Sequence, residues 1–201
     1  MQQHLVKGFN DPVQAAQQVF RQTLTALSEP GVAVALDASA QLPGLYPSTT
    51  ALLLTLLDQD TPLWLADGLH TPELTQNLVF HCGCPMATEQ VQGQFAVYDL
   101  AAFLAAPSHD FALGNERYPD LSATVIIQLP TTASSVDSVW RGPGILNQRD
   151  VALPMPAAFW ALRQKLIAFP RGVDFLFTFP EAVMGLPRTT VVTPSEESVC
   201  M

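Results

Sequence analysis

The chain has 201 residues, of which 48% are apolar and only 13% are charged, and it carries a net charge of −9. This length predicts a single domain over 1–201, and the acidic balance argues against nucleic acid or an anionic membrane as partners held by bulk electrostatics. No apolar run reaches the roughly 20 residues that span a bilayer, and the first residues lack a signal peptide's pattern, so we expect a cytoplasmic protein.

The first half of the chain predicts three helices and two strands. The first helix begins after Asp11, and its apolar residues, which include Phe20 and Leu24, recur at helical spacing. The second helix is apolar nearly all round, so we expect it to be buried. A short buried strand separates these two helices. The predicted helices cover 12–27, 48–57 and 71–82, and the predicted strands cover 32–36 and 62–66.

The second half predicts further alternation of helices and strands. Asp99 is expected to cap a short alanine-rich helix, and an amphipathic helix follows over 155–168. The segment 136–141 is expected to pair with the strand 124–129 through a polar turn. The remaining predicted strands cover 95–98, 174–179 and 190–192. This order predicts an α/β fold with a mixed sheet and a flexible tail over 194–201.

Several catalytic classes lack their motifs in this sequence. The chain contains no P-loop, no Gly-x-Gly-x-x-Gly and no Gly-x-Ser-x-Gly elbow. Neither Lys7 nor Lys165 is placed to form a Schiff base in a pocket, so we expect no pyridoxal phosphate and no other cofactor. No residue is assigned as catalytic.

The cysteines do not predict a disulfide framework or a metal site. Cys82 and Cys84 have a single residue between them and Cys200 stands alone, so no second pair of ligands exists. We expect no metal, and we expect Gly83 to take a positive φ in a turn after the third helix. The alternative for the adjacent His81 is a side chain that points into a site.

Arginines in restricted turns are the strongest binding signal. Three of the seven arginines, Arg141, Arg171 and Arg188, lie in turns in which glycine or proline is adjacent to the arginine. The planar guanidinium of arginine forms paired hydrogen bonds with phosphate and carboxylate groups. These turns therefore predict an anion site, with backbone N–H groups at Gly142 and Gly172 as further donors. Tyr118 and His81 are lower-ranked candidates for its lining. The alternative is that each arginine caps a helix or pairs with a local aspartate.

A set of short strings along nearly the whole chain resembles one family. They occur in the same order and spacing as in the PhnH subunit family of the bacterial carbon–phosphorus lyase system. The strings are Phe20-Arg21, Leu27-Ser-Glu-Pro30-Gly31, Asp60-Thr-Pro62, His81-x-Gly83-x-Pro85, Tyr118-Pro-Asp120, Arg141-Gly-Pro-Gly-Ile145, Phe169-Pro-Arg-Gly-Val-Asp174 and Leu186-Pro-Arg-Thr-Thr190.

This resemblance implies a fold, partners and a reaction. It implies a compact three-layer α/β/α version of the pyridoxal-phosphate transferase fold without the cofactor, a homodimer, and a complex with the G, I and J subunits. That machinery makes α-D-ribose 1-methylphosphonate 5-triphosphate from ATP and methylphosphonate and displaces adenine. Cys82 and Cys84 depart from the family pattern, so no role is transferred to them. The alternatives are a free-standing phosphonate- or nucleotide-binding transferase and a purely structural dimeric scaffold.

Overall fold

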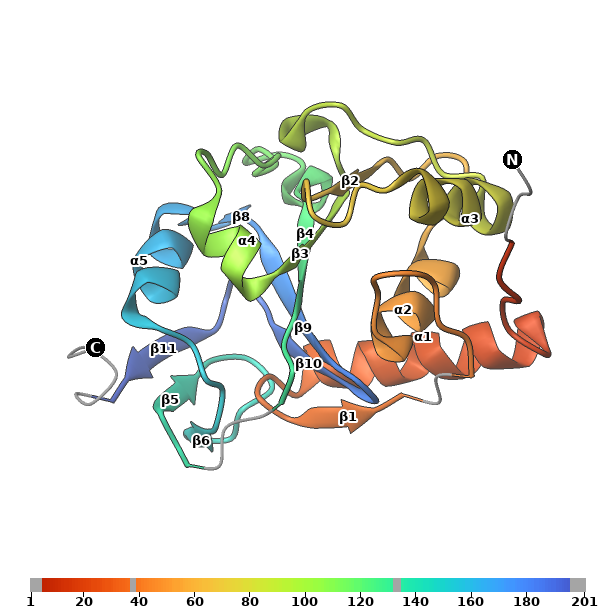
Figure 1. The fold of residues 1–201 in the computed structure, drawn as a ribbon. Coiled ribbons are helices and arrows are strands. Elements are labelled where there is room, and N and C mark those ends of the chain that lie inside the picture. Colours follow the sequence, from red (N-terminus) through yellow and green to blue (C-terminus); the bar gives the residue numbers. More distant parts are fainter. Residues whose placement is uncertain (1–4, 37–38, 132–134, 196–201) are drawn as a thin grey trace.

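A six-stranded mixed sheet forms the centre of the molecule in the computed structural model, which describes residues 5–36, 39–131 and 135–195 (Figure 1). Its strand order is β1-β10-β9-β4-β3-β2. β2, β3, β4 and β9 run parallel to one another, whereas β10 is antiparallel to both of its neighbours, β9 and β1. The strands of this sheet are β1 (Ala33–Ala35), β2 (Leu63–Leu65), β3 (Phe95–Asp99), β4 (Thr124–Gln128), β9 (Asp174–Phe179) and β10 (Ala182–Leu186).

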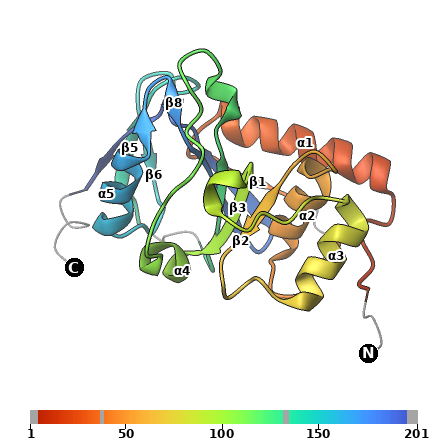
Figure 2. The same ribbon diagram turned by 90° about the horizontal axis from the view of Figure 1, so that it is seen from above.

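Helices cover both faces of this sheet (Figure 2). On one face, Val97, Ile126 and Leu176 pack in the same core as α1 (Pro12–Ser28), α2 (Pro47–Leu56) and α3 (Pro72–Cys82). The next residue of each strand points to the opposite face, where the core includes α4 (Leu100–Ala105) and α5 (Ala157–Lys165). The mixed α/β class predicted from the sequence is therefore confirmed.

Two small sheets complete the fold. The first has the order β11-β5-β6 and contributes the buried Trp140 and Val151 to the α4 and α5 side of the core. The second is the hairpin of β7 and β8. The remaining elements are β5 (Ser138–Arg141), β6 (Arg149–Val151), β7 (Ile167–Ala168), β8 (Arg171–Gly172), β11 (Val191–Pro194) and the 3-10 helices η1 (Gln90–Gln92) and η2 (Pro119–Leu121).

Local signals in the sequence correctly predicted where α1 and α4 begin. Asp11 accepts a hydrogen bond from the N–H of Gln14, and Asp99 caps α4 in the same way. Gly83 follows α3 with φ 69°, as predicted. Within the described residues, no helix is both long enough and apolar enough to cross a bilayer.

The predicted burial of one strand and the predicted pairing of another were wrong. The strand predicted over 32–36 as buried is β1, an edge strand whose ends are exposed. The segment 136–141 does not pair with β4, because β5 pairs with β6 and β11 instead. The mixed character of the main sheet comes from β10 and β1, and β10 was not predicted. Most of the predicted tail, 196–201, lies outside the described residues, while Pro194 ends β11.

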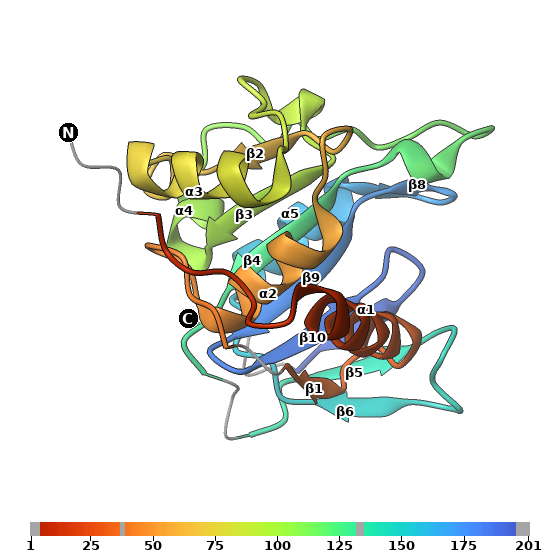
Figure 3. The ribbon, with the colours of Figure 1, turned by 90° about the vertical axis from the view of Figure 1, so that its right-hand side faces the viewer.

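The helix α1 packs on the sheet through its small side chains rather than through its large apolar ones. Its buried residues are Val19, Thr23 and Ala26. Gly185 of β10 makes this possible, because a Cβ there would lie 2.4 Å from the carbonyl oxygen of Ala26. The opposite side of α1 therefore remains at the surface, on the outside of β10 (Figure 3).

Candidate functional site

Arg188 lies at the centre of a polar network beside the amino ends of β4 and β9. Its Nη2 is 2.5 Å from Oδ2 of Asp174, and its Nε donates to both oxygens of the same carboxylate at 3.2 Å. Nη1 donates to the carbonyl oxygens of Pro119 at 2.8 Å and Pro170 at 3.5 Å. Nη2 also donates to the hydroxyl of Ser122.

These contacts use the whole hydrogen-bonding capacity of the guanidinium. An arginine side chain has five N–H donors, and here each of its three nitrogens has enough partners to engage them all. The side chains of Arg188 and Asp174 are only 13% and 25% exposed. A phosphate could reach Arg188 only by displacing Asp174 or a backbone carbonyl, so this geometry indicates a structural brace.

The brace borders a pocket of about 480 Å³ formed by three of the sequence strings. The string at Tyr118 supplies one wall, and the strings ending at Asp174 and Thr190 supply the others. The lining residues are Pro119, Asp120, Phe169, Pro170, Asp174, Pro187, Arg188 and Thr189. With one guanidinium against two carboxylates, the pocket does not concentrate positive charge.

A second arginine holds the Arg188 turn from the core side. Arg163 of α5 is buried, and its Nη2 donates to the carbonyl oxygens of Pro187 at 3.0 Å and Thr190 at 2.8 Å. Burial lowers the pKa of Arg163 to about 10, an effect that the charge of Asp174 opposes. Arg163 was not predicted from the sequence as a functional residue, because an arginine within a helix carries no local signal of burial.

The other two predicted arginines lie in neighbouring turns at the surface. Arg171 of β8 is exposed, its backbone pairs with Ala168 of β7, and its side chain makes no hydrogen bond or ion pair with another described residue. Arg141 ends β5, is exposed, and donates to Oε1 of Gln148. Neither lines the pocket beside Arg188. Their joint binding of an anion stays a prediction.

Gly142 and Gly172 serve close backbone packing. Both have φ 139°, and a Cβ at Gly142 would lie 3.0 Å from the carbonyl oxygen of Thr189. The Gly142 turn thus lies directly against the Arg188 turn. The N–H of Gly172 donates to the carbonyl oxygen of Leu113 at 2.9 Å, so this donor is already engaged.

The remaining candidates are placed differently. His81 lies on α3, where its Nε2 is 2.8 Å from the carbonyl oxygen of Val6 and its ring packs on Gly8. It holds the N-terminal segment on the helix rather than lining the pocket beside Arg188. The Tyr118 ring is exposed, and the Arg117 guanidinium lies 5.2 Å from its centre. No group of three metal-ligating side chains occurs within the described residues.

The protein therefore has a mixed α/β fold, and the short sequence strings described above form closely packed turns at one end of its sheet. The family model described as bacterial phosphonate metabolism protein (PhnH) matches residues 7–193, so the chain belongs to the PhnH family. A similar protein from Rhizobium meliloti (strain 1021) is named alpha-D-ribose 1-methylphosphonate 5-triphosphate synthase subunit PhnH. It is 37% identical over 189 residues, which cover 91% of this chain and 92% of the relative.

Proposed function

We propose that this protein is a subunit of α-D-ribose 1-methylphosphonate 5-triphosphate synthase, which joins methylphosphonate to the ribose of ATP with loss of adenine. The observation that carries the proposal is the 37% identity to a named subunit of that synthase along almost the full length of both chains. We also propose a cytoplasmic homodimer that assembles with the G, I and J subunits. Its fold would be a single-domain relative of the pyridoxal-phosphate transferases.

Co-purification tests this proposal. The tagged protein is expressed alone and together with the G, I and J subunits, and both preparations are assayed with ATP and methylphosphonate. We expect a stable complex, and we expect synthase activity only in that complex. Turnover by the isolated protein would support a free-standing transferase instead. Failure to retain any partner would contradict the subunit proposal.

The exposed face of α1 supplies a surface for such a partner. Val13, Phe20 and Leu24 are 65%, 48% and 50% exposed and lie at spacings of seven and four residues, so they form one apolar stripe. Since the small side chains of α1 already pack on the sheet, this stripe is unpaired within the described residues. We propose that another subunit of the synthase covers the α1 stripe.

Substitution of the α1 stripe should weaken assembly without unfolding the protein. We expect the double variant Phe20→Gln/Leu24→Gln to lose about tenfold or more in affinity for the partner subunits, because buried apolar anchors dominate interfaces. The matched control is Leu146→Gln, since the Leu146 side chain is 97% exposed and lies outside α1. Pull-down and light scattering measure the outcome. Unchanged capture of the partners would refute this role, and loss of the homodimer alone would assign the stripe to a second copy of this chain.

A further inference from the structure

A second and larger pocket lies away from the arginine turns. It has a volume of about 580 Å³, within the range of about 300–1,000 Å³ for small-molecule sites. Trp64 of β2 and Tyr98 of β3 line it, with their ring centres 5.0 Å apart. Alanines of α4 line another wall. We call this cavity the Trp64 pocket.

Its place in the sheet is one where α/β proteins commonly bind ligands. Residues 66–68 directly follow β2, and α4 directly follows β3. The helix after β2 is α3, on one face of the sheet, whereas α4 lies on the opposite face. In open α/β sheets, ligands commonly bind in the crevice at the carboxyl ends of two neighbouring strands whose following helices lie on opposite faces of the sheet.

Gln90 gives the Trp64 pocket a defined shape. Its Nε2 donates to the Tyr98 hydroxyl at 2.7 Å and to the carbonyl oxygen of Ser108 at 3.2 Å, and its Oε1 accepts from the N–H of Asp110 at 2.8 Å. One side chain therefore connects the segment 108–110 to Tyr98, and all of these residues line the pocket or lie beside it. Burial, with a smaller contribution from the charge of Asp67, raises the pKa of the Tyr98 hydroxyl above its usual value, so this hydroxyl keeps its proton at neutral pH.

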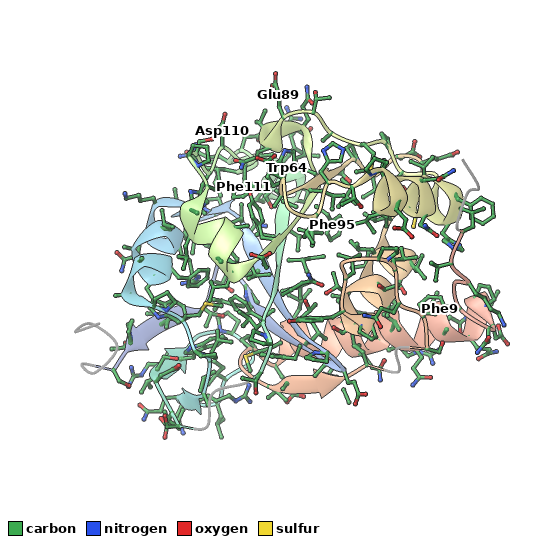
Figure 4. All side chains as sticks on the ribbon, in the orientation of Figure 1. Phe9, Trp64, Glu89, Phe95, Asp110 and Phe111 are labelled. Carbon is green, nitrogen blue, oxygen red and sulfur yellow. The ribbon has the colours of Figure 1, made fainter. Side chains whose placement is uncertain are left out.

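The charge of the Trp64 pocket restricts its ligand. Asp67, Glu89 and Asp110 line it, and none of the lining residues is lysine, arginine or histidine. None of these three carboxylates forms an ion pair within the described residues. Figure 4 shows Glu89 and Asp110 at the same end of the molecule as Trp64. Such a lining repels phosphate and phosphonate groups and accepts N–H donors.

We propose that the Trp64 pocket binds a planar, uncharged nitrogen heterocycle with N–H donors, of the nucleobase kind, through contact with Trp64 and hydrogen bonds to the carboxylates. Aromatic side chains recognise such rings through their faces, and carboxylates accept from exocyclic amines. This inference goes beyond the proposed function and rests on the pocket alone. Its failure would leave the co-purification result unaffected.

Calorimetric titration with adenosine, ATP and inorganic phosphate tests the proposal on the purified full-length protein. We expect saturable binding of adenosine, binding of ATP that is about tenfold weaker, and no binding of phosphate. Trp64→Ala should weaken adenosine binding by about tenfold or more, within the range for the loss of one base–aromatic stack. Asp120→Asn is the matched control, since Asp120 lines the pocket beside Arg188 instead.

A second variant keeps the test decisive if Trp64→Ala perturbs folding. Glu89→Gln/Asp110→Asn changes only exposed side chains, and it should reduce the preference for adenosine over ATP by about tenfold. The proposal is overturned if adenosine does not bind, if ATP binds as tightly as adenosine to the unaltered protein, or if neither variant changes these affinities.

Discussion

Replacing Arg188 with alanine is expected to lower the Tm by about 6–12 °C. The change leaves the Asp174 carboxylate, which is only 25% exposed, without its cation and removes the donors to Pro119 and Ser122. Removing one partner of a buried ion pair costs about 3 kcal/mol or more, and about 1 kcal/mol shifts the Tm of a chain of this size by roughly 2–4 °C. Thermal unfolding followed by circular dichroism measures the shift.

Arg171→Ala provides the matched control for Arg188→Ala. Arg171 is an exposed arginine of the neighbouring β7–β8 hairpin, and its side chain has no hydrogen bond or ion pair among the described residues. We expect the Tm of the Arg171→Ala variant to stay within about 2 °C of that of the unaltered protein, since such surface substitutions change the free energy of unfolding by about 0.5 kcal/mol or less. If Arg188→Ala melts as late as this control, the network around Arg188 is not a brace and its guanidinium is free to serve a ligand.

Local sequence signals predicted the helix starts and several of the buried strands, among them β4 and β9. Asp11 and Asp99 cap their helices because a side-chain oxygen reaches an N–H only three residues away, an interaction that a short window contains in full. The runs 125–127 of β4 and 175–177 of β9 are apolar without alternation because both faces of these strands are covered. Such features need no knowledge of distant contacts.

Long-range contacts decided the features that the sequence did not predict. Periodicity on α1 emphasised Phe20 and Leu24, yet the close approach of Gly185 to Ala26 selects the small face of this helix for the sheet. Arg188 likewise looked equivalent to Arg171 in sequence, since each follows a proline in a turn. Only the fold places Asp174 and Pro119 around one of them.

The family strings at 27–31 and 141–145 pack against each other. Arg149 Nη1 donates to the carbonyl oxygen of Pro30 at 2.5 Å, and a Cβ at Gly31 would lie 2.6 Å from Cγ2 of Val151. Gly144 lies over the end of α1, where its backbone approaches the carbonyl oxygen of Ser28. The glycines in these strings therefore serve the docking of the small sheet onto α1, which explains their pattern without a ligand.

Gly144→Ala is expected to lower the Tm by about 10 °C or more. Gly144 has φ 81°, and a Cβ there would lie 2.0 Å from the backbone oxygen of Ser28 and 2.9 Å from Pro30. The alanine must take a left-handed conformation and also push the turn away from α1, at a combined cost of about 3–5 kcal/mol. Thermal and urea unfolding measure the loss of stability.

Gly68→Ala separates this effect from the general cost of replacing a glycine. A Cβ at position 68 would meet nothing within 4 Å, and the φ of Gly68 lies outside the left-handed region. We therefore expect the Tm of the Gly68→Ala variant to differ from that of the unaltered protein by no more than about 2 °C. The displaced turn in Gly144→Ala should also expose Ile145, which is only 9% exposed in the native fold. Equal melting temperatures for the two variants would mean that the turn at 141–145 can leave α1 freely, and the docking of the small sheet would then have to depend on its other contacts.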